Sequence, residues 1–556
     1  MKRLPDRPNL DILKKQAKDL LSLYRHGDLT ALVRFRDTLP AAAEKNDQQI
    51  ASLDLRLHDA QSCLAREYGF PSWADLKSFV VARNAHSPDR AQSILNWLRL
   101  IYAGDISGST NRASPAAALR LLEGHPDIAG GNPYVACAIG DDAAIRDETE
   151  RDPTWVNRPG GPLNLPPLVA VTHSSMIRLP GFRDRLLACA RFLFDAGANP
   201  NQSVGSRWAP ASLSHPAEET PLSALYGAAG QNHDPDMTKL LLDAGADPND
   251  GESLYHSLDR PACTRILLDA GARVTGSNAM YRVLDLDSLE ALEMLLGSGG
   301  DPNEPAASRP TADWGTPLLW AIRRRRSAAH IAALLRAGAD PLASTPEGTS
   351  AQALSLQFGL KDVADLLSRA GSRGSLSLAE RFIAACALAD EAAARRILSE
   401  QPDLISKLSP KQLRQLPELA AEGCSDAVML MVKLGWPIAV RAGDWEASAL
   451  NHAVFRGDAD LARFLLEHGA SWKEQHGFGD NACGSLSWAS INEPAAGGDW
   501  LGCAKVLIAH GMPAGARDPA HPDAVLVDGR TKWFSDEVTD FLLDPSPARS
   551  DRELPS

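Results

Sequence analysis

The sequence predicts an all-α solenoid in which pairs of short helices stack one after another along the chain. Three observations predict this fold. A segment that ends in an apolar pair and a glycine recurs many times. The copies are spaced by about 33 residues. Several of the intervening segments begin with a Pro-Leu pair, which is typical of the first turn of a helix.

The recurring segment reads "LLLDAGADPND" over residues 240–250. An active site is normally unique in a chain, so a segment that recurs indicates a structural device. The acidic position varies freely, because Asp243 is matched by Gly297, Arg336 and Glu467, whereas the glycine persists. We therefore expect the glycine to end a helix in a left-handed conformation and the aspartates to form the turn that follows.

The recurring glycines mark the repeat along the chain. Their longest interval, from Gly371 to Gly435, divides where Gln401 and Pro402 replace the glycine. The remaining intervals range from 26 to 48 residues, with their mode near the low thirties. The marker glycines are Gly197, Gly245, Gly271, Gly299, Gly338, Gly371, Gly435, Gly469 and Gly511.

The other half of each unit points to a known family. The segments "ETPLSAL" (219–225) and "GTPLLWA" (315–321) resemble the Thr-Pro-Leu-His-x-Ala signature of ankyrin repeats, in which threonine caps a helix, proline starts it and leucine enters the core. Over about residues 90–515 the chain is similar to bacterial ankyrin-repeat proteins. The resemblance implies an ankyrin-type α-solenoid of about ten helix pairs with finger loops. The signature histidine is replaced by Ser223, Leu319, Asn451 and Ser487, so inter-repeat hydrogen bonds must differ from those of the family.

Four segments are expected along the chain. Residues 1–84 predict a helical N-terminal cap region, in which Asn9 caps a first helix and Ser72 caps a later one. Residues 90–371 and 376–515 predict two ankyrin-repeat sub-arrays, separated by a Gly/Ser stretch before the Ser377–Glu380 capping box. Residues 516–556 form a Pro/Asp-rich tail that we expect to be partly disordered, with one short helix in "FSDEVTDFLL".

Charge and cysteine usage limit the function classes. The chain has 57 Lys and Arg against 70 Asp and Glu, a net charge of −13, which disfavours nucleic acid and anionic membranes as partners. Its eight cysteines are dispersed without a Cys-x-x-Cys pair, which is typical of reduced thiols. Neither a signal peptide nor a membrane span is readable, so we expect a cytoplasmic protein. A protein exported by a dedicated machine to bind host proteins is the alternative.

Extra residues in the longer units all fall on the side of the finger loops, at 202–219, 304–313 and 473–483. The family resemblance implies that these loops and the ends of the first helices form a concave groove that binds one or more partner proteins. At the helix ends the matching residues are Arg323, Arg324, Phe455 and Arg456. The two arginines fit either an acidic partner or a solvated helix end. Phe455 fits either the groove or the core.

Tryptophan is concentrated near the C-terminus, where six of the chain's twelve lie between Trp436 and Trp533. Trp320 and Trp488 match an inward signature position, so we expect them in the core. Trp472 and Trp500 flank the finger at 473–483, and we expect them to be partly exposed and to bind a partner.

A metal or enzyme site in residues 468–503 is the alternative reading. His468, His476, Asp480 and Cys483 are acceptable zinc ligands, but their spacing matches no ligand rule. Motifs for nucleotide binding and for hydrolysis are absent from the sequence. We therefore expect no metal, no cofactor and no catalysis, and we predict a non-catalytic scaffold for protein-protein interaction.

Overall fold

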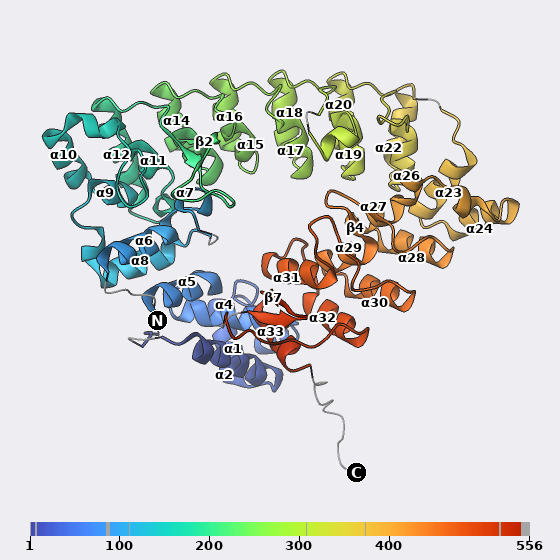
Figure 1. Ribbon diagram of the computed structural model, residues 1–556, viewed down its shortest axis with the longest axis horizontal. Coiled ribbons are helices and arrows are strands. Elements are labelled where there is room, and N and C mark those ends of the chain that lie inside the picture. Colours follow the sequence, from blue (N-terminus) through green and yellow to red (C-terminus); the bar gives the residue numbers. More distant parts are fainter. Residues whose placement is uncertain are drawn as a thin grey trace, which may run out of the picture. The chain divides into compact units, whose positions relative to one another are not determined.

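Two antiparallel helices and a glycine-ended turn form the unit that repeats along the chain (Figure 1). The structure is a computed structural model, and it describes residues 2–5, 8–84, 89–109, 112–306, 308–372, 374–521 and 524–545. First helices contact first helices of the next pair, as α27 contacts α29 and α29 contacts α31, and second helices stack likewise. The fold is the predicted all-α, ankyrin-type solenoid of stacked helix pairs with finger loops, preceded by a small helical cap.

The chain divides into two compact units. Unit 1 comprises Met1–Arg282 and Gly297–Gly300, and unit 2 comprises Val283–Leu296 and Asp301–Ser556. The junction predicted near residues 371–376 lies inside unit 2. There, Ser377 and Glu380 form the expected capping box at the start of α23.

Unit 1 begins with five helices around a shared apolar core. In α1, Asn9 caps the first turn, with its side chain accepting from the Asp11 amide at 2.7 Å. Ser72 likewise accepts from the Asp75 amide at 3.1 Å at the start of α5. Helix α1 packs on α4, and α4 packs on α5. The helices are α1 (Leu10–Arg25), α2 (Leu29–Thr38), α3 (Asp47–Ala51), α4 (Leu57–Glu67) and α5 (Trp73–Asn84).

The repeats of unit 1 follow this cap. The entry helices are α6 (Arg90–Ile101), α7 (Gly104–Ser107) and α8 (Pro115–Gly124). The pairs are α9 (Pro133–Ile139) with α10 (Asp142–Arg151), α11 (Pro167–Thr172) with α12 (Arg183–Asp195), α13 (Ala224–Tyr226) with α14 (Pro235–Asp243), and α15 (Ser253–Ser257) with α16 (Pro261–Asp269). Helix α17 (Ala279–Asp285) contains the division between the units.

The first long finger folds as a β-hairpin, which corrects one expected helix start. Strand β1 (Ser203–Ser206) pairs antiparallel with β2 (Ala217–Ser223), and Val204 lies opposite Leu222. The Thr-Pro-Leu segment at residues 220–222 therefore lies in a strand, and helix α13 starts only at Ala224, capped by Ser223. The prediction of a helix start at Thr220 was wrong because the hairpin ladder takes up these backbone groups.

A buried arginine ties this hairpin to an earlier part of unit 1. The Arg207 amide donates to the Asp105 carbonyl at 2.7 Å, and its guanidinium donates to the Ile106 carbonyl at 2.6 Å. Burial lowers the pKa of Arg207 to about 10. The finger therefore lies against α7 rather than projecting freely.

Unit 2 continues the same pairing. Its pairs are α19 (Pro317–Arg323) with α20 (Ala328–Arg336), α21 (Ala351–Gln357) with α22 (Lys361–Arg369), α23 (Leu378–Ala387) with α24 (Glu391–Glu400), α27 (Gln415–Ala421) with α28 (Ser425–Lys433), α29 (Ala449–Arg456) with α30 (Ala459–Glu467), and α31 (Ala482–Asn492) with α32 (Trp500–Ala509). Other helices are α18 (Leu289–Gly297), α25 (Leu404–Lys407) and α26 (Pro410–Leu413).

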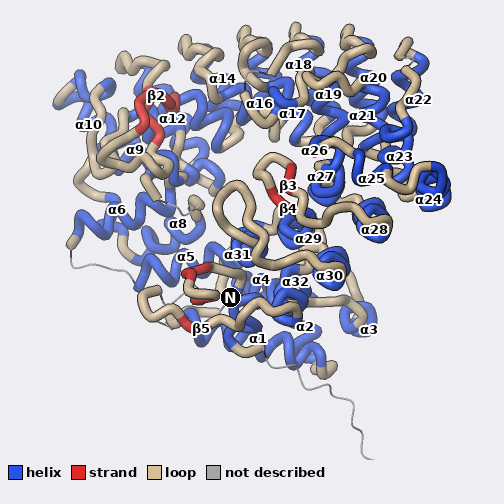
Figure 2. The backbone as a smooth tube through the Cα atoms, turned by 45° about the vertical axis from the view of Figure 1, so that its right-hand side comes forward, coloured by secondary structure: helices blue, strands red, loops and turns tan. Residues whose placement is uncertain are grey.

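The expected tail carries more structure than its composition indicates. Strands β5 (Ala516–Arg517), β6 (Val525–Val527) and β7 (Arg530–Lys532) form a three-stranded sheet. The predicted helix is present as α33 (Asp536–Leu543), which packs on α32. A second short hairpin, β3 (Arg441–Ala442) with β4 (Ala447–Ser448), precedes α29, and Figure 2 shows these short strands among the helices. Residues 522–523 and 546–556 of the tail, which was expected to be partly disordered, lie outside the described residues.

A buried apolar residue and a left-handed glycine close most of the repeats, whereas α10 and α24 end at Asp152 and Gln401. All nine marker glycines have positive φ, from 87° at Gly197 to 108° at Gly371, which confirms the predicted conformation. The residue four positions before each glycine is 0 % exposed: Leu193, Leu241, Leu267, Leu295, Leu334, Leu367, Met431, Leu465 and Leu507. Fully burying one such side chain stabilises the fold by about 1.5–3 kcal/mol.

Asparagines of the turns supply inter-repeat hydrogen bonds. The Asn201 side chain accepts from the amide of Asp247 in the next turn at 2.8 Å, and Asn303 accepts from Asp340 at 2.9 Å. The Asn303 amide also donates to the Gly338 carbonyl at 2.9 Å. These bonds satisfy backbone groups that a turn cannot satisfy alone.

The glycine and the aspartate of the 240–250 segment should respond differently to substitution. Gly245 has φ of 96°, so Gly245→Val forces a β-branched residue into a left-handed conformation. We expect a loss of about 1–3 kcal/mol in the free energy of unfolding, measured by urea titration.

Asp243→Asn is the matched control. The Asp243 side chain is 60 % exposed and forms only a surface pair with Lys239, so its loss should cost about 0.5 kcal/mol or less. Equal urea midpoints for the two variants would contradict the role assigned to the glycine.

Candidate functional site

A continuous row of aromatic rings runs over the last two helix pairs of unit 2. We call it the aromatic strip, and it consists of Trp445, Phe455, Trp488, His476 and Phe478. Phe455 and Trp488 are stacked with ring centroids 5.2 Å apart and an interplanar angle of 9°. Trp445 lies 5.4 Å from Phe455 and 4.9 Å from His476, which contacts Phe478 at 6.0 Å.

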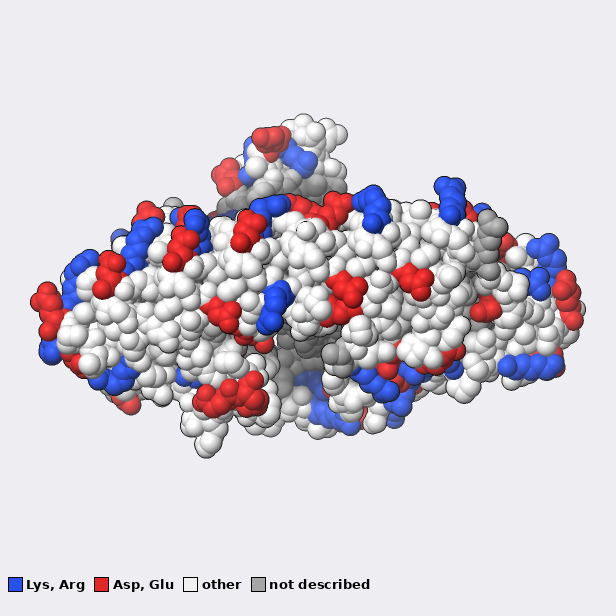
Figure 3. Space-filling model, turned by 90° about the horizontal axis from the view of Figure 1, so that it is seen from above, with Lys and Arg blue, Asp and Glu red and all other residues white. Residues whose placement is uncertain are grey.

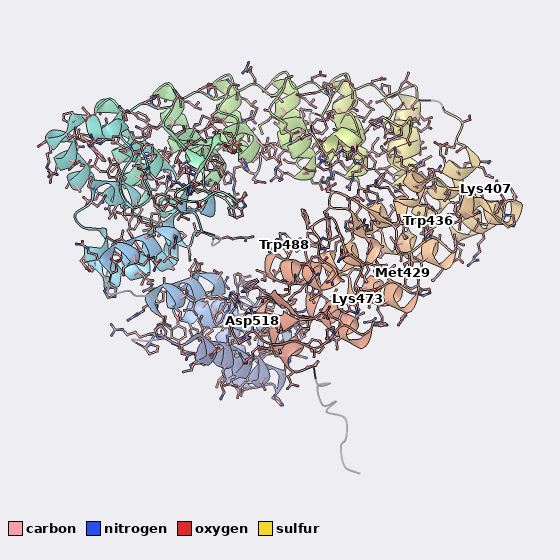
Figure 4. All side chains as sticks on the ribbon, in the orientation of Figure 1. Lys407, Met429, Trp436, Lys473, Trp488 and Asp518 are labelled. Carbon is pink, nitrogen blue, oxygen red and sulfur yellow. The ribbon has the colours of Figure 1, made fainter. Side chains whose placement is uncertain are left out.

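The rings of the aromatic strip are carried by the β3–β4 turn, helix α29, the following finger and helix α31. Phe455 is near the end of α29, just before Gly457, which ends the helix at φ of 71°. Trp445 lies in the turn between β3 and β4. Trp488 lies on α31, and Figure 4 labels it there and labels Lys473 in the finger that precedes this helix.

The aromatic strip is exposed at both ends. Trp488 is 53 % exposed and Phe478 is 81 % exposed, whereas Phe455 is half-buried. Connected aromatic surface of this kind is typical of interaction sites, because large apolar rings in water carry a cost that a partner can relieve. Figure 3 shows one face of the molecule, on which acidic and basic side chains are interspersed among uncharged ones.

The structure reverses the expected burial of three tryptophans. Trp472 and Trp500 retain 6 % and 9 % of their surface, so both are core residues rather than exposed groups. Trp500 begins α32 and donates from its indole nitrogen to the Phe455 carbonyl at 3.2 Å. Trp488 was expected in the core but is exposed, because α31 is the last first helix among the described residues and no further one follows to cover it.

Arg456 is directed away from the aromatic strip. Its guanidinium donates to the Ala421 carbonyl at 3.1 Å and packs against Gly423. It therefore joins α29 to the turn after α27.

The two arginines at the end of α19 are bound within unit 2. We call the cluster the arginine clamp, and it consists of Arg323, Arg324, Asp285, Glu418, Glu422 and Asp444. Arg323 is 1 % exposed and forms ion pairs with Glu418 at 2.8 Å, with Glu422 at 2.9 Å and with Asp444 at 3.2 Å. Arg324 pairs with Asp444 at 2.7 Å and with Asp285 at 2.8 Å.

Indole rings complete the arginine clamp. The Arg323 guanidinium lies 5.4 Å from the Trp314 ring and 5.5 Å from the Trp320 ring, and Arg324 lies 4.5 Å from Trp320. An external acidic partner would have to break these pairs to reach Arg323. The expectation of an accessible basic site at this residue was therefore wrong, because its charge is neutralised by carboxylates distant in sequence.

The electrostatics of the arginine clamp follow from its burial. Burial lowers the pKa of the Arg323 guanidinium, but the carboxylates of Glu418, Asp444 and Glu422 outweigh it and raise that pKa. Burial raises the pKa of Glu418 despite the neighbouring Arg323. The Glu418 carboxylate also accepts from the Gly443 amide at 3.0 Å, which holds the β3–β4 turn.

The proposed zinc residues have other partners. His468 lies 4.0 Å from the Phe464 ring, His476 contacts Trp445, and Asp480 pairs with Lys532. Burial raises the pKa of the Cys483 thiol to about 12. Within the described parts of the chain, no group of three or more His, Cys, Asp or Glu side chains is arranged to hold a metal ion.

No family model matches the chain, and no curated protein matches it in sequence. Among solved structures, the chain is similar to the ankyrin repeat domain of human ASB11, with 19 % identity over 42 % of this chain and 98 % of that chain and a TM-score of 0.21. Among the residues that the structure describes, no helix has the length and apolarity needed to cross a membrane.

Removing the centre of the arginine clamp should destabilise unit 2. Arg323→Ala leaves the buried Glu418 without its guanidinium, whereas Glu422 retains Arg324 at 3.8 Å, and breaking a buried pair in this way costs about 3–5 kcal/mol. The free energy of unfolding from urea titration measures the loss. Arg336→Ala is the control, since this arginine is 69 % exposed and pairs only with Glu293. A loss no larger than that of the control would mean that Arg323 is solvated.

His452 should make stability fall as the pH falls. This buried ring contacts Trp445 at 4.9 Å, and burial lowers the pKa of His452 to about 4. Between about pH 6.5 and pH 4 the unfolded chain binds a proton that the folded chain rejects, so up to about 3 kcal/mol is lost over this window. The groups facing the ring are the Ala442 carbonyl, Arg323, Asp444 and Arg456.

The measurement compares wild type with His452→Gln by urea unfolding at several pH values. Glutamine retains an N–H donor for the Ala442 carbonyl but does not titrate. The stability difference between the two proteins should shrink as the pH falls from 7 to 4. A constant difference would contradict the neutral, buried state of His452.

Proposed function

We propose that this protein is a non-catalytic scaffold that binds one or more partner proteins through the concave ankyrin groove and the finger loops, with the aromatic strip as its main recognition surface. The observation that carries the proposal is the stacked pair of Phe455 and the half-exposed Trp488. Aromatic side chains are enriched among the residues that dominate binding energy at interfaces. A stacked pair is also already ordered, so binding costs little side-chain entropy.

The proposed groove residues differ in their roles. Phe455 and Trp488 would contact the partner directly, and Phe478 would extend the contact from the finger. Arg456 stabilises the end of α29 by donating a hydrogen bond to the Ala421 carbonyl at the end of α27. Trp500 and Trp472 act as core supports.

The proposal places the scaffold in the cytoplasm of a bacterial cell. All eight cysteines are described, and they are free thiols, seven of them buried. Free thiols are typical of a reducing compartment. The net charge of −13 favours protein partners over nucleic acid.

Partner capture tests the recognition surface. A partner is first identified by affinity purification from the native cytoplasm, and its affinity is then measured for each variant. Phe455→Ala and Trp488→Ala should each weaken binding by roughly 30-fold, the equivalent of about 2 kcal/mol. Trp488→Ala should leave the melting temperature nearly unchanged, because this ring is exposed.

Trp208→Ala is the matched control, since this tryptophan is 58 % exposed but belongs to the hairpin of unit 1. We expect it to retain wild-type affinity. Loss of binding in Trp208→Ala with full binding in Trp488→Ala would move the recognition surface to unit 1. Unfolding of Phe455→Ala would show that Phe455 is a core residue and would leave Trp488→Ala as the deciding variant.

A further inference from the structure

The region around the aromatic strip is strongly acidic. Residues 437–545 contain 8 Lys and Arg against 16 Asp and Glu. Several of the basic side chains are engaged within the region: Arg530 and Lys532 both pair with Asp480, and Arg463 pairs with Asp460. An excess of negative charge therefore remains to attract a basic partner.

Carboxylates also adjoin two rings of the strip in the sequence. Asp444 and Glu446 lie on either side of Trp445 in the β3–β4 turn, where Asp444 already pairs within the arginine clamp and Glu446 pairs with Arg414. Glu493 caps the end of α31 beyond Trp488 and is exposed. Aromatic faces bordered by carboxylates attract cations, because the negative face of the ring and the carboxylates act in the same direction.

The arginine clamp shows how this chain already binds a guanidinium. There, Arg324 lies over the Trp320 ring at 4.5 Å while its nitrogens pair with Asp444 and Asp285. The aromatic strip offers an exposed indole ring, that of Trp488, and the exposed carboxylate of Glu493 at the end of the same helix. Among the described residues, no arginine of the chain makes a cation–π contact with the Trp488 ring.

We propose that the aromatic strip binds a net basic segment of the partner through an arginine whose guanidinium stacks on the exposed face of Trp488. This inference rests on the proposed function and specifies its partner chemistry. Arginine is favoured over lysine because its planar, weakly hydrated guanidinium stacks on a ring while still donating hydrogen bonds to carboxylates.

The test uses the full chain and three synthetic peptides of equal length, in which a Gly/Ser host carries Arg, Lys or Glu at the same positions. Binding is followed by titration calorimetry. The Arg peptide should bind at least about threefold more tightly than the Lys peptide, and the Glu peptide should bind most weakly. Affinity for the Arg peptide should fall as sodium chloride rises.

Variants locate the binding site. Trp488→Ala should weaken the Arg peptide by about tenfold, whereas Trp488→Phe, which keeps a ring, should weaken it less. Trp208→Ala should bind like the wild type. Equal affinity for the Arg and Lys peptides, or equal affinity of Trp488→Ala and Trp208→Ala for the Arg peptide, would overturn the inference.

The experiments distinguish failure of the proposed recognition surface from failure of the proposed arginine chemistry. If Trp488→Ala loses the native partner while the Arg peptide shows no preference, the recognition surface stands and the arginine chemistry is wrong. If the Arg peptide binds in a Trp488-dependent way while native-partner capture is unaffected by Trp488→Ala, the chemistry stands and the proposed recognition surface is wrong.

Discussion

The buried guanidinium of Arg323 is the interaction on which the candidate site of unit 2 depends. It draws Glu418 and Glu422 at α27 and Asp444 of the β3–β4 turn to the end of α19, although these residues are separated along the chain by two intervening helix pairs. Asp444 adjoins Trp445, so the same ion pairs place the first ring of the aromatic strip. A charge buried this deeply is stable only while its partners remain in place, which makes the turn rigid.

A buried arginine also holds a hairpin in unit 1, where Arg207 donates to carbonyls of α7 and anchors the β1–β2 hairpin. In a solenoid each repeat contacts mainly its neighbours, so a long insertion has few local partners. A buried arginine supplies several donors on a long side chain and reaches elements beyond the neighbouring repeat. Both hairpins are therefore fixed by distant contacts, whereas ordinary turns rely on glycines and on asparagine bonds such as that of Asn201.

The repeat itself was readable from the sequence because its causes are local. A left-handed glycine such as Gly245, the buried residue four positions earlier and the caps at Asn9 and Ser377 each depend on a few neighbouring residues. The helix start expected at Thr220 failed because a paired strand, a non-local partner, took up the same backbone. The sheet of β5–β7 was missed for the same reason, since its short strands are weak patterns until they pair.

The sequence by itself determined the class of fold, the repeat period and the region of unit 2 in which rings gather. Only the tertiary structure decided which rings are exposed, because exposure depends on whether a neighbouring element covers a residue. Trp488 is exposed since, in the part of the chain that the structure describes, no first helix follows α31. Trp472 and Trp500 are buried, and the Trp500 indole donates to the Phe455 carbonyl of the preceding helix pair. Likewise, a run of four arginines indicates positive charge, but only the fold brings carboxylates from α27 and β3–β4 to neutralise Arg323. Burial and ion pairing depend on contacts from segments that are distant in the sequence, and a local sequence pattern does not show those contacts.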